Sequence, residues 1–447
     1  MSFPRYPKYK DSGVEWLGEV PEGWEIKKIK SFSSFSGGGT PSRENLAFWN
    51  GDIPWVSPKD MKTERIIGAE ESISDEGLRS SSTTLIQANR LLMVVRSGIL
   101  KHTIPVAINE VPVALNQDMK AIDFDDTLCA SGFFLRWVQG LNSQLLLAWS
   151  KQGATVESIE HDYLVNTIVP LPPLEEQTAI AGFLDRETAK IDALVAEQKR
   201  LVELLKEKRQ AVISHAVTKG LNPAAPMKPS GIEWLGEVPT HWAVGTLTRI
   251  AERIVVGIAE AATHAYVEVG TPILRATNVR PGKIIGEMLH LDSVFADDRG
   301  TKLLNAGDLV TVRTGNAGVT AVVPIELDGC QCFTMLITTL IKTSVADFYC
   351  YLMNGVAARC YFSLEGWGTA QINISVPILK CLPVPIPTLA EQTAIVEFLD
   401  AETAKIDALT AEAQRAIELL QERRTALISA AVTGKIDVRT IAQKETA

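Results

Sequence analysis

Three consecutive glycines, Gly37–Gly39, are the stretch that comes nearest to a phosphate-binding loop. A nucleotide cradle needs a glycine loop that opens a helix, whereas Thr40 and Pro41 follow here and favour a turn. The sequence contains no GxxxxGK[ST], HExxH or GxSxG motif, and no Asn-Pro-Pro-aromatic methyltransferase tetrapeptide. We therefore expect a chain that binds or organises other molecules, without catalytic residues, metal ligands or a cofactor of its own.

The cysteines do not form the pairs that metal or redox sites require. The six cysteines contain no CxxC pair, and five of them lie in the second half of the chain among apolar residues. We expect buried free thiols in a reducing, cytoplasmic compartment. No apolar run approaches the ~20 residues of a membrane span, and the N-terminus lacks a signal-peptide core.

One helical sequence occurs twice in the chain. Residues 174–194 and 389–409 are identical at 17 of 21 positions, and the same offset of 215 relates 204–218 to 419–433. A Trp-containing segment, Ser12–Trp24, recurs as Ser230–Trp242 at an offset of 218. The chain is therefore a duplicated unit consisting of a Trp segment, a variable globular segment and a helical segment.

Each helical copy is long enough for a coiled coil. Prolines precede both copies, and a helix of ~42 residues would be ~63 Å long. Apolar residues step alternately by four and three, as knobs-into-holes packing requires. The predicted seam consists of Ile180, Leu184, Ile191, Leu194, Leu201, Leu205 and Val212 in the first copy, and Ile395, Leu399, Ile406, Leu409, Leu420 and Leu427 in the second.

Charged residues interrupt this seam at equivalent places in the two copies. Glu187 matches Glu402, and Lys208 matches Arg423. In an antiparallel pair, Glu187 would approach Arg423 and Lys208 would approach Glu402, which would set the register. The alternative is two separate helices, each packed on its own domain.

Both globular segments contain short β-like runs separated by turn residues. Each carries a run that ends in an arginine, at Arg96 or Arg313. We predict an α+β protein in which two globular domains with mainly antiparallel sheets are separated by two long helices forming an antiparallel coiled coil. The expected boundaries are 1–173 and 221–388 for the domains, 174–220 and 389–436 for the helices, and 437–447 for a tail.

Three motifs carry a resemblance to a known family. PPLEEQTAI at 172–180 and PTLAEQTAI at 387–395 open the two helices, and GGTPSRENLAFWNGDIPWVSPKD stands at 38–60. With these motifs the chain resembles, over nearly its whole length, the specificity (S) subunits of type I restriction-modification systems. Residues 253–279 resemble a different type of target recognition domain, which implies two different half-sites.

The resemblance implies that each globular segment is a target recognition domain reading one half of a bipartite site in double-stranded DNA. The helices would fix the gap between the half-sites. Two methyltransferase (M) subunits would dock on this frame and bind adenosylmethionine. Restriction (R) subunits would bind ATP and Mg²⁺, and no membrane is involved.

Neither domain is basic overall, so DNA contacts must come from local clusters. Residues 1–173 hold 17 basic and 21 acidic side chains, and residues 221–388 hold 12 and 14. Arginine can form two hydrogen bonds with guanine, asparagine can form two with adenine, and lysine mostly contacts phosphate. The candidates are Lys59, Lys62, Arg65, Arg96, Lys101 and His102 in the first domain, and Arg275, Asn278, Arg280, Lys283 and Arg313 in the second.

Two other functions remain open. One is a coiled-coil scaffold of S-like sequence that reads no DNA. The other is a fused restriction-methylation enzyme, which the lack of a methyltransferase motif disfavours. Since the domains are acidic, we also expect M subunits to supply much of the phosphate clamp.

Overall fold

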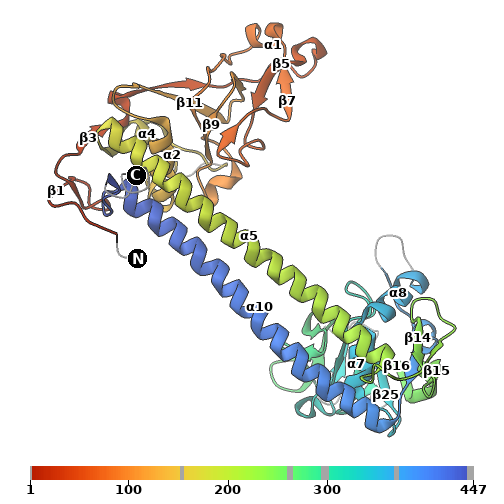
Figure 1. Cartoon of the computed structure of the whole chain (residues 1–447). Helices are drawn as coiled ribbons and strands as arrows, with labels where there is room; N and C mark the ends of the chain where they lie inside the picture. The colour runs from red at the N-terminus through yellow and green to blue at the C-terminus, as the bar shows by residue number, and fades with distance from the viewer. Residues whose placement is uncertain (1–2, 152–155, 259–264, 293–301, 367–371, 440–447) are drawn as a thin grey trace. The chain divides into compact units, whose positions relative to one another are not determined.

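The computed structural model describes residues 3–151, 156–258, 265–292, 302–366 and 372–439. The chain forms two compact units: unit 1 comprises Met1–Gln198 and Arg415–Ala447, and unit 2 comprises Lys199–Gln414. Each unit contains one α+β domain and one part of each long helix, α5 (Leu174–Lys219) and α10 (Leu389–Val432) (Figure 1). The predicted fold class is confirmed.

The domain of unit 1 is built on a five-stranded sheet with the order β4-β11-β8-β9-β6, antiparallel except between β6 and β9. A second sheet has the order β10-β5-β7. All four residues of β8 are buried, as in strands covered on both faces. The strands are β4 (Ser33–Gly37), β5 (Trp49–Val56), β6 (Arg65–Ile66), β7 (Glu71–Ile73), β8 (Leu91–Val94), β9 (Val106–Asn109), β10 (Ala114–Leu115) and β11 (Met119–Phe124).

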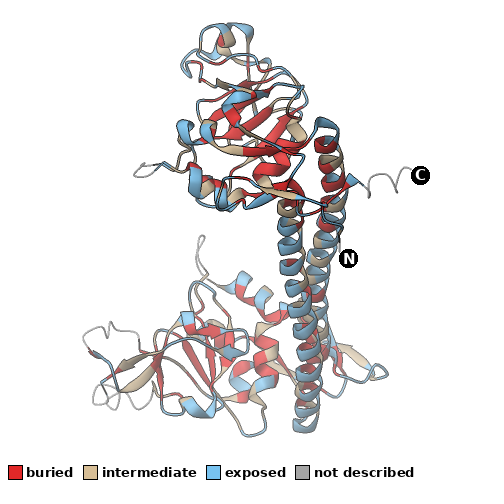
Figure 2. Ribbon diagram, turned by 90° about the vertical axis from the view of Figure 1, so that its left-hand side faces the viewer, coloured by how far each residue is buried: buried red, intermediate tan, exposed pale blue. Residues whose placement is uncertain are grey.

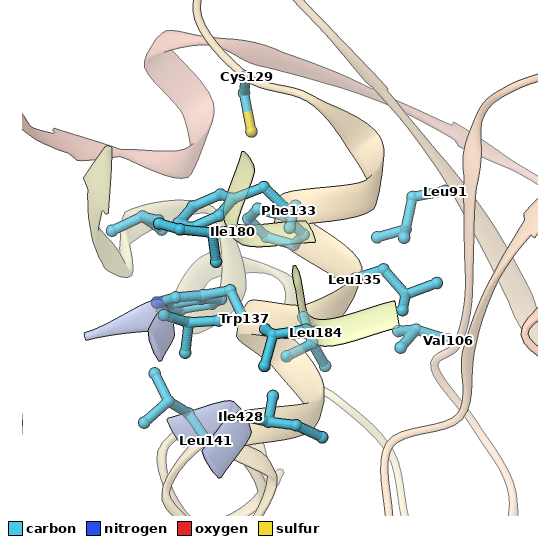
Figure 3. Packing of buried hydrophobic residues seen from close by; sticks show 14 of the residues in the cluster. Leu91, Val106, Cys129, Phe133, Leu135, Trp137, Leu141, Ile180, Leu184 and Ile428 are labelled. Carbon is cyan, nitrogen blue, oxygen red and sulfur yellow. The ribbon is translucent and has the colours of Figure 1, made fainter. Parts of the chain in front are cut away.

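Helix α2 (Ser131–Gly140) joins this domain to the long helices. Its side chains Phe133 and Trp137 are fully buried. They belong to one core with Ile180 of α5 and Ile428 of α10 (Figure 3). The remaining elements of unit 1 are α1 (Asp75–Arg79), α3 (Asn142–Trp149), α4 (His161–Asn166), and the strand pairs β1 (Tyr9–Asp11) with β2 (Glu19–Pro21) and β3 (Glu25–Lys28) with β12 (Ile168–Leu171).

Unit 2 repeats this plan. Its sheets have the orders β16-β25-β22-β23 and β17-β21-β18-β24. The larger sheet contains β16 (Ala251–Val256), β22 (Leu309–Thr311), β23 (Thr320–Val322) and β25 (Leu336–Leu340). The smaller sheet contains β17 (Tyr266–Val267), β18 (Thr271–Leu274), β21 (Leu289–Leu291) and β24 (Gln331–Cys332).

The small elements of unit 2 match those of unit 1 in register. Lys28 pairs with Ile168 in unit 1, and the equivalent Thr246 pairs with Pro383 in unit 2. The strand pairs are β13 (Met227–Pro229) with β14 (Glu237–Pro239), β15 (Ala243–Thr246) with β26 (Pro383–Ile386), and β19 (Val279–Arg280) with β20 (Lys283–Ile284). The helices are α7 (Ala346–Asn354), α8 (Val356–Glu365) and α9 (Val376–Lys380).

A buried glutamine fixes the start of each long helix. The Gln177 side chain accepts a hydrogen bond from the Ala130 amide at 2.8 Å and donates to the Leu128 and Pro172 carbonyls. Gln392 accepts from the Val345 amide, also at 2.8 Å, and donates to the Thr343 and Pro387 carbonyls. Because buried amides must find partners, this residue ties each helix to its domain.

The preceding glutamate holds the Trp segment. The Trp24 indole nitrogen donates to Glu176 at 3.0 Å, and the Trp242 indole nitrogen donates to Glu391 at the same distance. Burial pushes the pKa of Glu391 upward, but hydrogen bonds from Trp242, His241 and Thr388 outweigh it and lower the pKa to about 2. The recurring Glu-Gln pair therefore anchors two parts of each domain at one helix end.

Glycines with positive φ end both long helices. Gly220 has φ 74° and Gly434 has φ 73°, as glycines after a helix commonly do. The second helix ends at Val432, four residues before the predicted end at 436, because Gly434 stops it. Residues 437–439 of the expected tail pack on unit 1, where the Asp437 amide donates to the Pro4 carbonyl at 2.8 Å. Residues 440–447 lie outside the described residues.

In each unit α5 and α10 are joined by an ion pair. Arg424 lies 2.9 Å from Asp192 in unit 1, and Arg209 lies 3.3 Å from Asp407 in unit 2. The offset of 215 converts one pair into the other. In unit 1 the first part of α5 lies beside the last part of α10, and in unit 2 the last part of α5 lies beside the first part of α10, so the two helices are antiparallel.

The predicted seam contains one row with Ile180, Leu194 and Leu201, equivalent to Ile395 and Leu409 in the second helix, and this row is wrong by one residue beyond Ile180 and Ile395. Leu194 and Leu409 expose 46% and 49% of their surface, and Leu201 is exposed as well. Thr188 and Thr403 are buried instead. Buried or half-buried are Ile180, Leu184, Ile191, Leu205, Val212, Ile395, Leu399, Ile406, Leu420 and Leu427.

The shift has a physical reason. Thr188 and Thr403 satisfy their hydroxyls by donating to the carbonyls of Leu184 and Leu399, so threonine is tolerated inside. Leu194, Leu201 and Leu409 therefore form an outer row that faces away from the partner helix, although leucine usually prefers the interior.

The arginines that form ion pairs between the helices also lie one position after the residues predicted. Arg209 and Arg424 form the cross-helix pairs in place of Lys208 and Arg423. Glu187 pairs with Lys190 on its own helix. Glu402 pairs with Lys405, which lowers the pKa of Glu402, and the more distant charge of Lys208 lowers it further. The approach of Glu187 to Arg423 stays a prediction.

The register predicts unequal effects of two neighbouring truncations. Ile191→Ala removes a buried side chain and should lower the free energy of unfolding by about 2–5 kcal/mol. Leu194→Ala, its matched control on the outer row, should change it by less than about 0.5 kcal/mol. Urea titration of the purified chain, followed by circular dichroism, measures both values. If both variants lowered the free energy of unfolding equally, Leu194 would have to be buried between the helices, as the sequence predicted.

Candidate nucleic-acid interface

Seven of the eleven candidate residues lie on one segment of each domain, called the loop below, which also contains the two-residue strands β6 in unit 1 and β19 and β20 in unit 2. In unit 1 the loop follows β5 and carries Lys59, Lys62 and Arg65; in unit 2 it follows β18. The Ile-Ile-Gly sequence at 66–68 recurs at 284–286, an offset of 218. The two loops are therefore equivalent positions of the duplicated fold. The members in unit 2 are Arg275, Asn278, Arg280 and Lys283.

The loop of unit 1 is held by one aspartate and leaves its cations outside. Asp60 accepts hydrogen bonds from the Ser57 and Glu70 amides at 2.8 and 2.7 Å. Lys59 and Arg65 are exposed. Lys62 lies 2.8 Å from Glu70, so part of its charge is already balanced. Exposed cations on a braced loop suit contact with a phosphate backbone.

Asn278 is the counterpart of Asp60, and its assignment as an adenine-reading residue is wrong. It is 3% exposed and accepts a hydrogen bond from the Arg275 amide. Its side-chain nitrogen donates to the Ile285 and Glu287 carbonyls. With its oxygen and both amide hydrogens used inside the protein, Asn278 shapes the loop and offers nothing to a base.

Two other cations of the unit 2 loop are partly committed to the backbone. Arg280 donates from one guanidinium nitrogen to the Thr277 and Val279 carbonyls at 3.1 and 3.0 Å. Arg275 reaches the Glu287 carbonyl at 3.4 Å. Lys283 is exposed at the start of β20. Among these residues, Arg280 and Lys283 keep exposed charge for a ligand.

Arg96 and Arg313 each end a similar run, but the register of the strands does not make them equivalent. The isolated bridges pair Arg96 with Ser158 in unit 1 and Thr314 with Asn373 in unit 2, so Arg96 corresponds to Thr314. The Ile159 amide donates to the Val95 carbonyl as the Ile374 amide donates to the Arg313 carbonyl, so Arg313 corresponds to Val95. Arg96 lies 2.6 Å from Asp118, and Arg313 donates to the neutral side chain of Asn373 at 3.0 Å, so each arginine has a partner within its own domain.

Lys101 and His102 lie after β8. Lys101 ends the short helix η3 (Gly98–Lys101), and His102 follows it. Both side chains are exposed. They remain candidates for contact with DNA.

Sequence reasoning missed Arg43. Its guanidinium lies 3.8 Å from the ring centre of Trp49 and 5.2 Å from that of Trp55, and it pairs with Glu71. An arginine stacked on aromatic rings is held flat, and here both terminal nitrogens of the guanidinium already donate to the Glu71 carboxylate. The signal was present in the sequence, since Arg43 lies within the motif at 38–60 that carries the family resemblance.

The described residues contain neither a cluster of metal ligands nor a membrane-spanning helix. No group of three or more His, Cys, Asp or Glu side chains in the described ranges is placed to hold a metal ion. No helix in that part of the chain is long and apolar enough to span a membrane. The cysteines Cys129, Cys330, Cys332 and Cys350 are buried and free.

Residues 21–204 and 271–419 match the family described as "Type I restriction modification DNA specificity domain". The chain belongs to this family. It is 35% identical over 206 residues to the EcoR124I/EcoR124II specificity subunit of Escherichia coli, a match that spans 46% of this chain and half of that relative's length. It is 23% identical over 434 residues to the MjaIX specificity subunit of Methanocaldococcus jannaschii, covering 94% of this chain and 95% of the other.

Solved structures support the fold. One from a study of type I R-M complex assembly and conformational transition has a TM-score of 0.71 at 16% identity, covering 92% of this chain and 98% of the other. The HsdS subunit of Thermoanaerobacter tengcongensis has a TM-score of 0.53 at 14% identity, covering 93% and 98%. The chain is thus a specificity subunit of the type I restriction-modification class, which is consistent with DNA binding.

Proposed function

We propose that this specificity subunit reads an asymmetric bipartite DNA site, with one recognition domain for each half and α5 and α10 as the ruler between them. One observation carries this proposal. The anchors, the cross-helix ion pairs and the order of four strands in the larger sheet (β4-β11-β8-β9 and β16-β25-β22-β23) recur in both units, while the loops that would face DNA differ. Asp60 is replaced by Asn278 and Arg65 by Lys283, and Arg43 belongs to a motif of the first domain alone.

Exposed leucines at equivalent positions of α5 and α10 support docking of two methyltransferase subunits. Leu174, Leu194 and Leu204 are exposed on α5, and Leu389, Leu409 and Leu419 are exposed at the equivalent positions of α10. The outer faces of both helices are largely exposed (Figure 2). Because these leucines recur at equivalent positions of the duplicated frame, two copies of one partner would each meet the same exposed leucines.

The subunit itself is proposed to be non-catalytic. Methylation with adenosylmethionine would come from the two M subunits, and ATP- and Mg²⁺-dependent cleavage from R subunits. The acidic balance of both recognition domains supports a phosphate clamp shared with M subunits, because each neutralised phosphate requires a cation.

The test of the reading function is the methylation pattern in cells. The chain should be co-expressed with the M subunit of its own system, and methylated adenines should be mapped by single-molecule sequencing. We expect a two-part motif with methyladenine in each half. A variant with residues 1–173 replaced by another recognition domain should change one half and leave the other unchanged. A change in both halves would contradict separate readers, and no motif at all would favour the scaffold alternative.

The test of the docking surface uses the outer leucines. The double variant Leu194→Glu with Leu409→Glu should lower co-purification of the M subunit at least about tenfold, because each leucine buried on docking contributes about 1.5–3 kcal/mol. Leu147→Glu, an exposed leucine on α3, is the matched control and should leave co-purification unchanged. Unchanged binding of the double variant would remove these leucines from the docking surface.

A further inference from the structure

Unit 2 contains a cavity at the place where its domain meets the two long helices. It has a volume of about 360 Å³, at the lower end of the range of ligand pockets. Helix α7 contributes Asp347 and Tyr351, and the turn before β20 contributes Gly282. The long helices contribute Asp400 and the ion pair of Arg209 with Asp407. One residue considered above for contact with DNA, Lys283, also lines this cavity, and none of the leucines considered for methyltransferase docking does.

Unit 1 shows what fills the equivalent place. The Arg136 guanidinium lies 2.6 Å from Asp185 and 2.8 Å from Glu64. Arg136 is only 5% exposed although it is charged. Glu64 also lies 3.4 Å from Arg424. A charge can be buried this far because two carboxylates surround it and bind it through several nitrogens.

The duplication shows which parts of this arrangement unit 2 has lost. Tyr351 stands at the position of Arg136, at an offset of 215, and Gly282 at the position of Glu64, at the domain offset of 218. Asp185 is retained as Asp400. Unit 2 therefore keeps the carboxylate but lacks the arginine and the glutamate, and both replacement residues line the cavity that remains.

Tyr351 does not neutralise the negative charge of the carboxyl groups beside it. The Tyr351 hydroxyl donates to Asp400 at 2.7 Å but brings no positive charge. Asp347, which replaces Gly132 of unit 1, adds a second carboxyl; burial raises the pKa of Asp347, and the neighbouring Asp400 raises it further. A cation placed between Asp347 and Asp400 would relieve their repulsion.

The three cations that line the cavity are placed differently. Arg209 is paired with Asp407, and Arg359 donates to the side chain of Gln210. Lys283 is exposed at the start of β20. In unit 2 the Tyr351 hydroxyl thus takes the carboxylate partner that the Arg136 guanidinium has in unit 1, and the cavity beside it is lined by Asp347 and Asp400.

We propose that this cavity binds a guanidinium group, presented as an arginine side chain by a partner protein, beside the Tyr351 hydroxyl that stands where Arg136 stands in unit 1. Guanidinium is the group that the fold itself accepts at this position, and its planar donors match a carboxylate bidentately. Unit 1 carries its own arginine, so one unit offers this site and the other does not. If two identical M subunits dock, as proposed above, they meet unequal surfaces; the guanidinium site itself does not depend on that docking.

The experiment uses the full chain without M subunits or DNA. Butylguanidine is titrated against protein with labelled isoleucine and alanine methyl groups, since Ile213 and Ala404 line the cavity. Their resonances should shift saturably with a Kd of about 1–10 mM. Butylamine, which has the same chain and charge without the planar group, should bind at least fivefold more weakly, and inorganic phosphate should leave both resonances in place.

Variants locate the binding. Tyr351→Arg supplies the missing guanidinium internally and should abolish the shifts, whereas Tyr351→Phe should keep them. Asp400→Asn should weaken binding at least tenfold, and Asp185→Asn, the equivalent change in unit 1, should leave the titration unchanged. If Asp400→Asn fails to fold, the comparison of Tyr351→Arg with Tyr351→Phe still decides.

Four outcomes would overturn the proposal. They are no saturable shift with butylguanidine, equal binding of butylamine, binding of phosphate in its place, and unchanged butylguanidine binding by Tyr351→Arg. Each is observed on the isolated chain, so it leaves the proposed reading of DNA and docking of M subunits untouched. Failure of the methylation test would likewise leave the guanidinium site standing.

Discussion

The buried side-chain amide at the start of each long helix is the interaction on which the rest of the structure depends. Gln177 and Gln392 each join three backbone groups, one on their own helix start and two on the loop before α2 or α7. Leaving such buried groups without a partner costs about 1–3 kcal/mol each. The amide therefore fixes where each domain sits on its helix, and a recognition domain can act as a reader only when that position is fixed.

The same anchor explains how the two domains diverge without loss of the frame. The Glu-Gln pair, the Trp segment and the cross-helix arginine-aspartate pair recur at constant offsets, so each domain is attached in the same way. The residues between these anchors change freely, as the exchange of Asp60 for Asn278 shows: both brace one loop with different chemistry. Even the junction has diverged, because Arg136 with Glu64 became Tyr351 with Gly282 and left a cavity in unit 2.

The duplication, both helix starts and the α+β class could be predicted because each depends on a local sequence signal. These signals are the prolines, the identical helical stretches and the β-like runs. The seam was half right. Assigning the heptad by hydrophobicity placed Leu194 between the helices. In the structure Val195 and Thr188 are the residues turned inward, and Thr188 is tolerated there because its hydroxyl donates within its own helix. Asn278 was misassigned because its burial depends on carbonyls seven and nine residues away, and the stacking of Arg43 on Trp49 and Trp55 depends on the fold of its motif.

The ruler is the central claim, and its length is open to direct measurement. Duplicating residues 192–198 in α5 and 411–417 in α10 adds one heptad to each helix and keeps the knobs-into-holes pattern. At 1.5 Å per residue the frame lengthens by ~10 Å, or roughly three base pairs. Methylation mapping should show both half-sites unchanged and the gap between them longer by about three base pairs. An unchanged gap with intact half-sites would contradict the ruler.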